Sequence, residues 1–146
     1  MKKLILISVI LLAALYFGFA QNKSVSIHNN VETIHSSDHI IERAFKNRSN
    51  NLQVEGQGVV IKLLPDDLSD RRHQRFIIRL SSGQTLLIAH NIDLAPRLIS
   101  LRKGDSVFFY GVYEWNSKGG TIHWTHHDPE RRHTACWIKH NGKKYQ

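Results

Sequence analysis

Cysteine is the scarcest chemical group in this chain of 146 residues, which contains only Cys136. One thiol cannot form an internal disulfide, and it cannot supply the paired cysteines of a zinc ribbon or an iron–sulfur site. Its neighbours Ala135, Trp137 and Ile138 are apolar, which predicts a packed rather than a reactive side chain. Small exported eukaryotic domains usually carry disulfides, so this composition fits a bacterial protein better.

Acidic residues are also few, with 12 Asp and Glu against 20 Lys and Arg, for a net charge of +8. Hydrophobic residues make up 41% of the chain, which is enough for a core and excludes wholesale disorder. The length predicts one small domain. Histidine is unusually frequent, with 10 residues.

The N-terminus has the pattern of a secretion signal. Lys2 and Lys3 precede a mostly apolar stretch over residues 4–17, and small residues follow at Gly18 and Ala20. We expect cleavage after Ala20; the alternative is an uncleaved anchor, although the stretch is shorter than the ~20 residues that usually span a bilayer. The expected location is periplasmic or secreted, or else the inner membrane with the domain in the periplasm. This segment would be the protein's only membrane contact.

Residues 21–51 are expected to form a polar spacer followed by an amphipathic helix. Candidate N-cap residues occur at 36–38, and Ile40, Ile41, Ala44 and Phe45 form one apolar stripe. The predicted organisation is therefore a signal peptide or anchor over residues 1–20, the spacer and helix over 21–51, and a β domain over 52–146.

The β domain shows alternating hydrophobicity separated by turn signals. Strands are predicted over residues 54–64, 73–81, 84–90, 106–115 and 121–127, with a short helix over 94–101 and a terminal hairpin over 136–145. Gly56 and Gly58 suggest a bend or bulge in the first strand. Five strands with a helix between the third and fourth predict a mostly β fold, a small OB-like five-stranded Greek-key barrel. A different small barrel or a sandwich is the alternative.

Histidines concentrate in the fifth predicted strand, at His123, His126 and His127, followed by Asp128. On a straight strand His123 and His127 share a face, and His126 joins them only if a bend, such as one near Pro129, breaks the alternation. Imidazole suits divalent transition metals, so the three histidines are candidate metal ligands. Histidines that stabilise the barrel through hydrogen bonds are the competing interpretation.

The same region supplies a candidate catalytic set of His123, His127 and Asp128, together with Arg75. A histidine oriented by an aspartate acts as an acid or base near neutral pH, and an arginine stabilises an anionic transition state. This combination suits a phosphodiesterase or nuclease, with or without a metal.

A second polar group comes from the second and third strands, which form the usual ligand face of an OB-fold. The candidate ligand-binding residues are Arg72, His73, Arg75, Arg79, His90 and Asp93. Such a basic row could hold phosphates or acidic sugars. A solvated polar face is the alternative.

Three segments resemble a family of short exported bacterial proteins known only as a domain of unknown function. They are RHQRFIIRLSSGQTLLIAHNIDLAP at residues 72–96, YGVYEWNSKGGTIHWTHHDP at 110–129 and WIKHNGKKYQ at 137–146. The resemblance covers residues 52–146 and implies a bacterial exported protein. It implies no activity, cofactor or ligand, and no functional residue is carried over from it.

The leading functional hypothesis is a non-enzymatic, exported OB-like domain that binds an anionic ligand or polymer, either a nucleic acid or an acidic glycan. One alternative is the His/Asp-dependent hydrolase, with a divalent transition metal as its possible cofactor. Another is a structural module of the cell envelope that contacts a protein partner. The sequence leaves the oligomeric state open.

Overall fold

A computed structural model describes residues 37–128 and 134–146. The expected export segment, residues 1–20, lies outside the described residues. Within the described part of the chain, no helix is long and apolar enough to cross a membrane.

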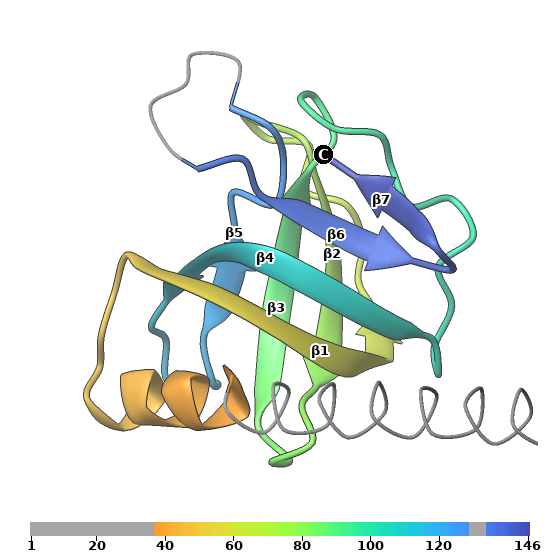
Figure 1. Ribbon diagram of the computed structural model, residues 1–146. Helices are drawn as coiled ribbons and strands as arrows, with labels where there is room; N and C mark the ends of the chain where they lie inside the picture. Colours follow the sequence, from red (N-terminus) through yellow and green to blue (C-terminus); the bar gives the residue numbers. More distant parts are fainter. Residues whose placement is uncertain (1–36, 129–133) are drawn as a thin grey trace, which may run out of the picture. The chain divides into compact units, whose positions relative to one another are not determined.

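The described strands form one sheet that closes into a barrel (Figure 1). They are β1 (Leu52–Leu63), β2 (His73–Arg79), β3 (Thr85–Asn91), β4 (Ser106–Glu114), β5 (Thr121–His123), β6 (Trp137–His140) and β7 (Lys143–Tyr145). Their order is β1-β2-β3-β5-β4-β6-β7, and an additional pairing of β1 with β4 closes a five-stranded barrel. β3 and β5 are parallel, whereas the other pairs are antiparallel. The expected OB-like barrel with a terminal hairpin is confirmed.

Alternation along the strands separates the core from the outer surface. Phe76 and Ile78 of β2 and Leu86 and Ile88 of β3 are fully buried, and full burial of such a side chain contributes roughly 1.5–3 kcal/mol. The residues between them point outward and are half-buried or exposed. These outward-pointing residues form the outer face of β2 and β3, which is the expected ligand face.

The glycines of β1 make room for core side chains rather than forming the expected bulge. A Cβ on Gly56 would lie 2.6 Å from Cζ of Phe109, and one on Gly58 would lie 2.9 Å from Cδ1 of Ile78. The irregularity in strand register occurs instead between Val60 and Lys62. Sequence pattern alone does not separate a glycine required for space from one required for a bulge.

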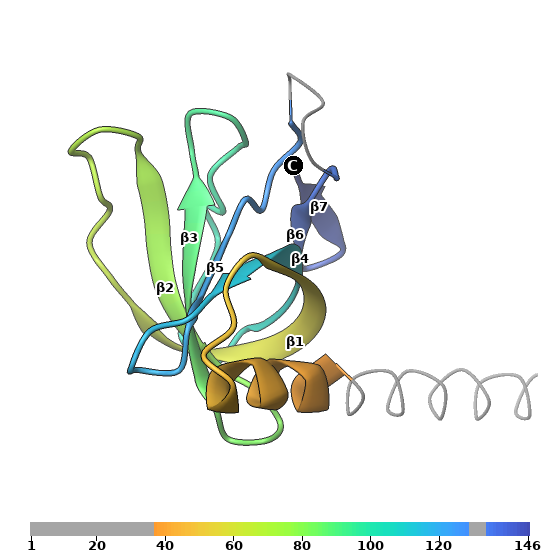
Figure 2. The same cartoon turned by 90° about the vertical axis from the view of Figure 1, so that its left-hand side faces the viewer.

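Residues 37–46 are helical and lie at the lower end of the barrel (Figure 2). Ile41 and Ala44 are buried in the barrel core. The helix therefore belongs to the same compact unit as the barrel, residues 34–146, although the sequence pattern grouped it with the spacer. Asp38, an expected N-cap, instead accepts hydrogen bonds from Ser81 Oγ at 2.5 Å and from the Ser82 amide at 3.1 Å.

The short helix expected over residues 94–101 is not formed, since turns and irregular chain connect β3 to β4. Pro96 has no amide hydrogen and disfavours helical geometry at Ala95. The Leu98 backbone bonds instead to the buried Gln74 amide: its N–H donates to Oε1 at 2.9 Å, and its carbonyl accepts from Nε2 at 3.1 Å. Side-chain bonding thus replaces the helical hydrogen bonds.

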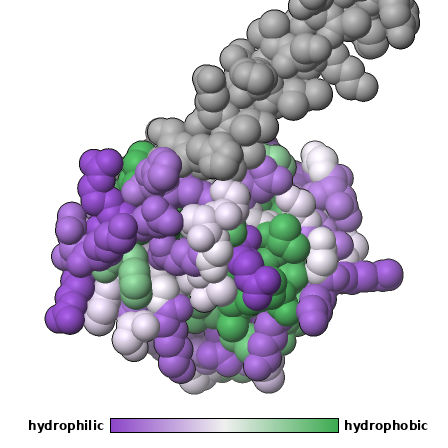
Figure 3. All heavy atoms as spheres, turned by 90° about the horizontal axis from the view of Figure 1, so that it is seen from below, coloured by the Kyte–Doolittle hydropathy of each residue, from purple (hydrophilic) through white to green (hydrophobic). Residues whose placement is uncertain are grey.

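Some large apolar side chains remain on the surface. Ile99 is 88% exposed and Leu68 is 66% exposed, and both lie in connecting segments. The view from below shows a contiguous apolar area bordered by hydrophilic side chains (Figure 3). Single exposed apolar residues such as Ile99 and Leu68 are normal in folded proteins, so we assign no function to these two.

Candidate functional site

Strand β5 is only three residues long and ends at His123. The next residue, Trp124, has a φ of +55°, a left-handed conformation that is an outlier for a bulky side chain. The expected strand over residues 121–127 is therefore wrong beyond His123. The chain bends at Trp124, which breaks the strand alternation, whereas Pro129 lies outside the described residues.

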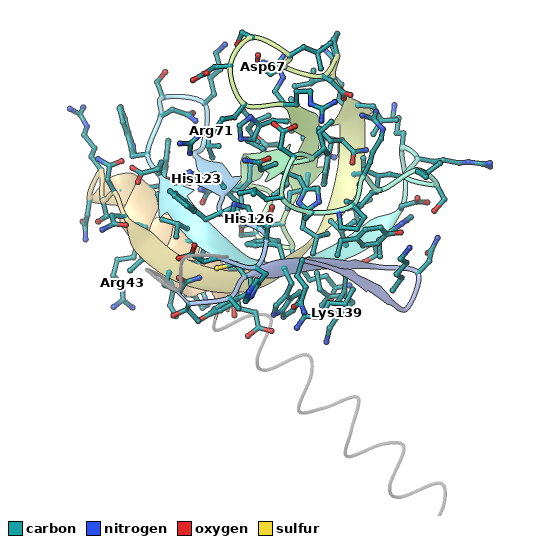
Figure 4. All side chains as sticks on the ribbon, turned by 90° about the horizontal axis from the view of Figure 1, so that it is seen from above. Arg43, Asp67, Arg71, His123, His126 and Lys139 are labelled. Carbon is teal, nitrogen blue, oxygen red and sulfur yellow. The ribbon has the colours of Figure 1, made fainter. Side chains whose placement is uncertain are left out.

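The bend places His126 on the same side of the sheet as His123. Both side chains, together with Arg71, His73, Asn91 and Trp124, line a hollow of about 220 Å³, called here the upper hollow. Seen from above, Arg71, His123 and His126 lie near one another, whereas Arg43 and Lys139 lie at the periphery (Figure 4). The Trp124 ring lies between two imidazoles, with centroid distances of 5.8 Å to His123 and 5.7 Å to His126.

Main-chain carbonyls orient two imidazoles of the upper hollow. His73 Nδ1 lies 2.6 Å from the Arg71 carbonyl oxygen, and His126 Nδ1 lies 2.7 Å from the His127 carbonyl oxygen. A carbonyl can only accept a hydrogen bond, so Nδ1 must carry the hydrogen in both rings. In the neutral form Nε2 is then the basic nitrogen of each ring.

The imidazole of His123 lies near a carboxylate rather than a main-chain carbonyl. Its Nε2 is buried without a hydrogen-bond partner among the described residues, and Glu114 Oε1 lies 3.7 Å away. Burial lowers the pKa of His123, and the Glu114 carboxylate opposes this effect. His123 is therefore neutral at pH 7 in the free protein. The Glu114 carboxylate is close enough to favour protonation of the ring.

His90 supports the upper hollow from inside the barrel. The side chain is fully buried, its Nε2 donates to the Pro96 carbonyl at 3.1 Å, and its Nδ1 accepts from Thr125 Oγ1 at 2.8 Å. Burial lowers its pKa from 6.5 to about 4. His90 was a candidate ligand-binding residue. In the structure it lies inside the barrel, and its hydrogen bond to Thr125 fixes the segment after Trp124.

Much of the expected basic row is neutralised by neighbouring carboxylates. Arg72 pairs with Asp93 at 2.6 Å, so the charge of each side chain is balanced by the other. Arg75 donates to the Pro65 carbonyl at 3.1 Å and lies 3.8 Å from Asp67.

The remaining basic residues of the row are far apart. Arg79 is exposed at the other end of β2 from His73. The six residue steps between them span about 20 Å. His73 alone of the expected row lines the upper hollow.

The candidate catalytic and metal sets are not brought together. His127 is exposed and does not line the upper hollow, whereas Asp128 is buried. Across residues 37–128 and 134–146, no three or more His, Cys, Asp or Glu side chains are placed to hold a metal ion. The bend at Trp124 explains this, because it turns His126 inward and His127 outward.

Arg71 and Trp124 line the upper hollow but were not candidate residues from the sequence, and neither was the nearby Glu114. Arg71 directly precedes the basic row, which was the available signal. No local signal marks Trp124, because left-handed turns are usually identified by Gly or Asn.

Cys136 is buried, as its apolar context predicted. Its thiol donates to the Thr134 carbonyl at 3.1 Å and accepts from Gln53 Nε2 at 3.3 Å. Burial raises the pKa of Cys136, so the thiol form dominates at pH 7. Cys136 is a structural residue.

The family model described as "Protein of unknown function (DUF3465)" matches residues 24–146. The chain belongs to this family. The match spans the helix and every strand of the barrel, so the upper hollow lies within the DUF3465 domain. No curated protein matches the chain.

Proposed function

We propose that this DUF3465 protein is an exported, OB-like domain that binds an anionic ligand or polymer through the upper hollow. The observation that carries the proposal is the strained turn at Trp124, which adds His126 to His73 and His123 around one concavity. Proteins retain such backbone strain, which costs on the order of 1–3 kcal/mol, mostly at functional sites.

The polar lining of the upper hollow favours a negatively charged group. Among the described residues, Arg71, Asn91 and three histidines line it and no carboxylate does, although Glu114 lies 3.7 Å from His123. Hydrogen bonds from cationic donors to an anion are about twice as strong as neutral ones. Arg71 and the Asn91 amide would donate to a phosphate or carboxylate, and the charge of that anion would favour protonation of His123.

The size of the upper hollow favours one small anionic group with an attached ring. Its volume of about 220 Å³ corresponds to roughly seven water molecules at ~30 Å³ each. Trp124 supplies a flat surface on which a sugar or base could stack. Nucleic acids and acidic glycans both offer this combination.

The proposal is tested by measuring binding of single-stranded DNA, RNA and an acidic glycan across a salt series. We expect affinity for at least one of them that weakens between ~50 and ~200 mM salt. Arg71→Ala should weaken binding by roughly tenfold, the effect of losing one charged hydrogen bond.

Arg43→Ala is the matched control for Arg71→Ala. Arg43 is also an exposed arginine, but it lies on the helix, away from the upper hollow (Figure 4). Its loss should change affinity by less than about twofold. Absence of binding to all three polymers at low ionic strength would contradict the proposal.

A second candidate function is phosphodiester hydrolysis at the same site, with different residues from those expected from sequence. Fixed Nδ1–H tautomers leave the Nε2 atoms of His73 and His126 as the basic nitrogens, and Arg71 lines the same hollow. One neutral imidazole would accept the proton of the attacking hydroxyl at Nε2, while the other, in its imidazolium form, would give its Nε2 proton to the leaving oxygen.

Turnover of RNA and DNA, measured with and without a chelator, separates the two functions. Hydrolysis that is lost in His73→Gln but retained in His127→Gln would support the second candidate. Binding without turnover would support the first.

A further inference from the structure

A second concavity lies at the lower end of the outer face of β2 and β3, and we call it the lower groove. Its volume is about 590 Å³. Its lining includes Lys62, Leu64, Ile77, Leu87, Asn116 and Lys118. Aliphatic side chains thus occur beside two lysines, and no carboxylate of the described residues is part of the lining.

Strand register shows that the upper hollow and the lower groove share one face of the sheet. His73 and Ile77 lie four residues apart on β2, so their side chains point to the same side. Their partners on β3 are Asn91 and Leu87. His73 and Asn91 line the upper hollow, whereas Ile77 and Leu87 line the lower groove.

One outward-facing residue pair lies between the two concavities on β2 and β3. The intervening pair is Arg75 opposite Ala89, and Ala89 has only a methyl group. The Arg75 guanidinium is held to one side by the Pro65 carbonyl and Asp67. The two concavities are therefore successive along β2, where His73 and Ile77 are about 14 Å apart by strand rise, and we call them together the track.

We propose that this track binds a chain of an acidic glycan, with one acidic sugar in the upper hollow and the following sugars in the lower groove. This inference rests on the proposed function and extends it from a single anionic group to an oligosaccharide. Arg71 at one end and Lys62 and Lys118 at the other offer separate positive charges for acidic groups along one chain.

The lining favours a glycan over a nucleic acid. Single-stranded nucleic acids bind through aromatic side chains on which successive bases stack. Among the described residues, the track provides one Trp, Tyr or Phe ring, that of Trp124, and the lower groove has none in its lining. A glycan depends less on such stacking, because its C–H groups can contact aliphatic side chains such as Ile77 and Leu87 and its hydroxyls can bond to the Asn91 amide.

The test is the length dependence of binding to mono-, tri- and hexagalacturonate, compared with oligodeoxynucleotides of matched charge. We expect affinity to rise by roughly tenfold or more from the monomer to the hexamer, since the lower groove adds contacts. The hexamer should also bind more tightly than the matched oligonucleotide.

Lys62→Ala/Lys118→Ala isolates the lower groove. The double variant should weaken hexagalacturonate binding by roughly fivefold or more and leave monogalacturonate binding unchanged. Lys46→Ala, which removes an exposed lysine of the helix, is the matched control and should change neither affinity.

Two results would overturn the track. Equal affinity for the monomer and the hexamer, with no effect of the double variant, would restrict binding to the upper hollow and leave the proposed function intact. Tighter binding of the oligonucleotide would show that the ligand of the track is a nucleic acid rather than a glycan. Failure of every anion to bind would instead contradict the proposed function itself.

Discussion

Trp124 combines an unfavourable backbone conformation with a central position in the upper hollow. Its φ of +55° costs an L-residue roughly 1–2 kcal/mol, whereas glycine adopts it freely. The indole ring between His123 and His126 offers a reason for a side chain here despite that cost.

Comparing Trp124→Gly with Trp124→Ala separates the backbone from the ring. Both variants lose the indole, but only alanine keeps the strain, so the glycine variant should be more stable by roughly 0.5–1 kcal/mol after its larger unfolded-state entropy. Urea unfolding measures the difference. Equal stability, or a more stable alanine variant, would show that the turn is not strained.

Glu114 adjusts the charge of His123 across a distance of 3.7 Å. Because the carboxylate raises a pKa that burial lowers, Glu114→Gln should lower the pKa of His123 further. An NMR titration of the imidazole checks this. A pKa that rises or stays constant in the variant would mean that the two groups do not interact in solution.

His90 makes the stability of the domain depend on pH. Its folded pKa of about 4 lies below the unfolded value, so the unfolded state binds the proton more readily. Its contribution is complete above pH 6.5 and is lost as the pH falls toward 4, an effect of about 3 kcal/mol. The measurement is the urea midpoint across this range.

His90→Gln should remove most of that pH dependence, and the exposed His39→Gln on the helix should keep it. If both variants lose stability with the wild-type slope, another group is responsible for the acid sensitivity.

At the scale of elements, β4 positions the upper hollow through a glycine. A Cβ on Gly111 would lie 2.7 Å from the His123 carbonyl oxygen and 3.0 Å from Thr125 Cγ2. The segment that contains Trp124 can therefore approach β4 only because position 111 has no side chain. This links the sheet to the geometry of the site.

Gly111→Ala should destabilise the fold by about 1–3 kcal/mol, as overpacking does, and should also weaken anion binding. Gly83→Ala is the control, because that turn has a φ of +90° but no atom near the new methyl group. It should cost about 1 kcal/mol with unchanged binding. Unchanged anion binding in Gly111→Ala would show that the packing of β4 does not determine the geometry of the site.

The elements differ in how far the sequence predicts them. The alternation of Phe76 and Ile78 identified β2 and its inward face, because a half-buried strand produces that period directly. The helix expected after β3 failed because Gln74, distant in sequence, bonds to the Leu98 backbone. The site was anticipated as a histidine cluster, but its membership depends on the turn at Trp124, which no local residue preference indicates.

At the scale of the molecule, several acidic side chains are already paired with arginines. Asp93, Asp67 and Asp66 contact Arg72, Arg75 and Arg97 respectively. Arg71, Lys62 and Lys118 line the two concavities, whereas other exposed basic residues, such as Arg79, Lys139 and Lys144, lie outside them. The basic residues of the concavities favour a polyanion along this face.

The most direct test of the upper hollow is an NMR titration of the isotope-labelled protein with hexagalacturonate at low salt. We predict that the largest shift changes occur at Asn91, His123 and His126, and that they saturate together. Shift changes confined to the β6–β7 hairpin, with these three residues unperturbed, would contradict the central claim.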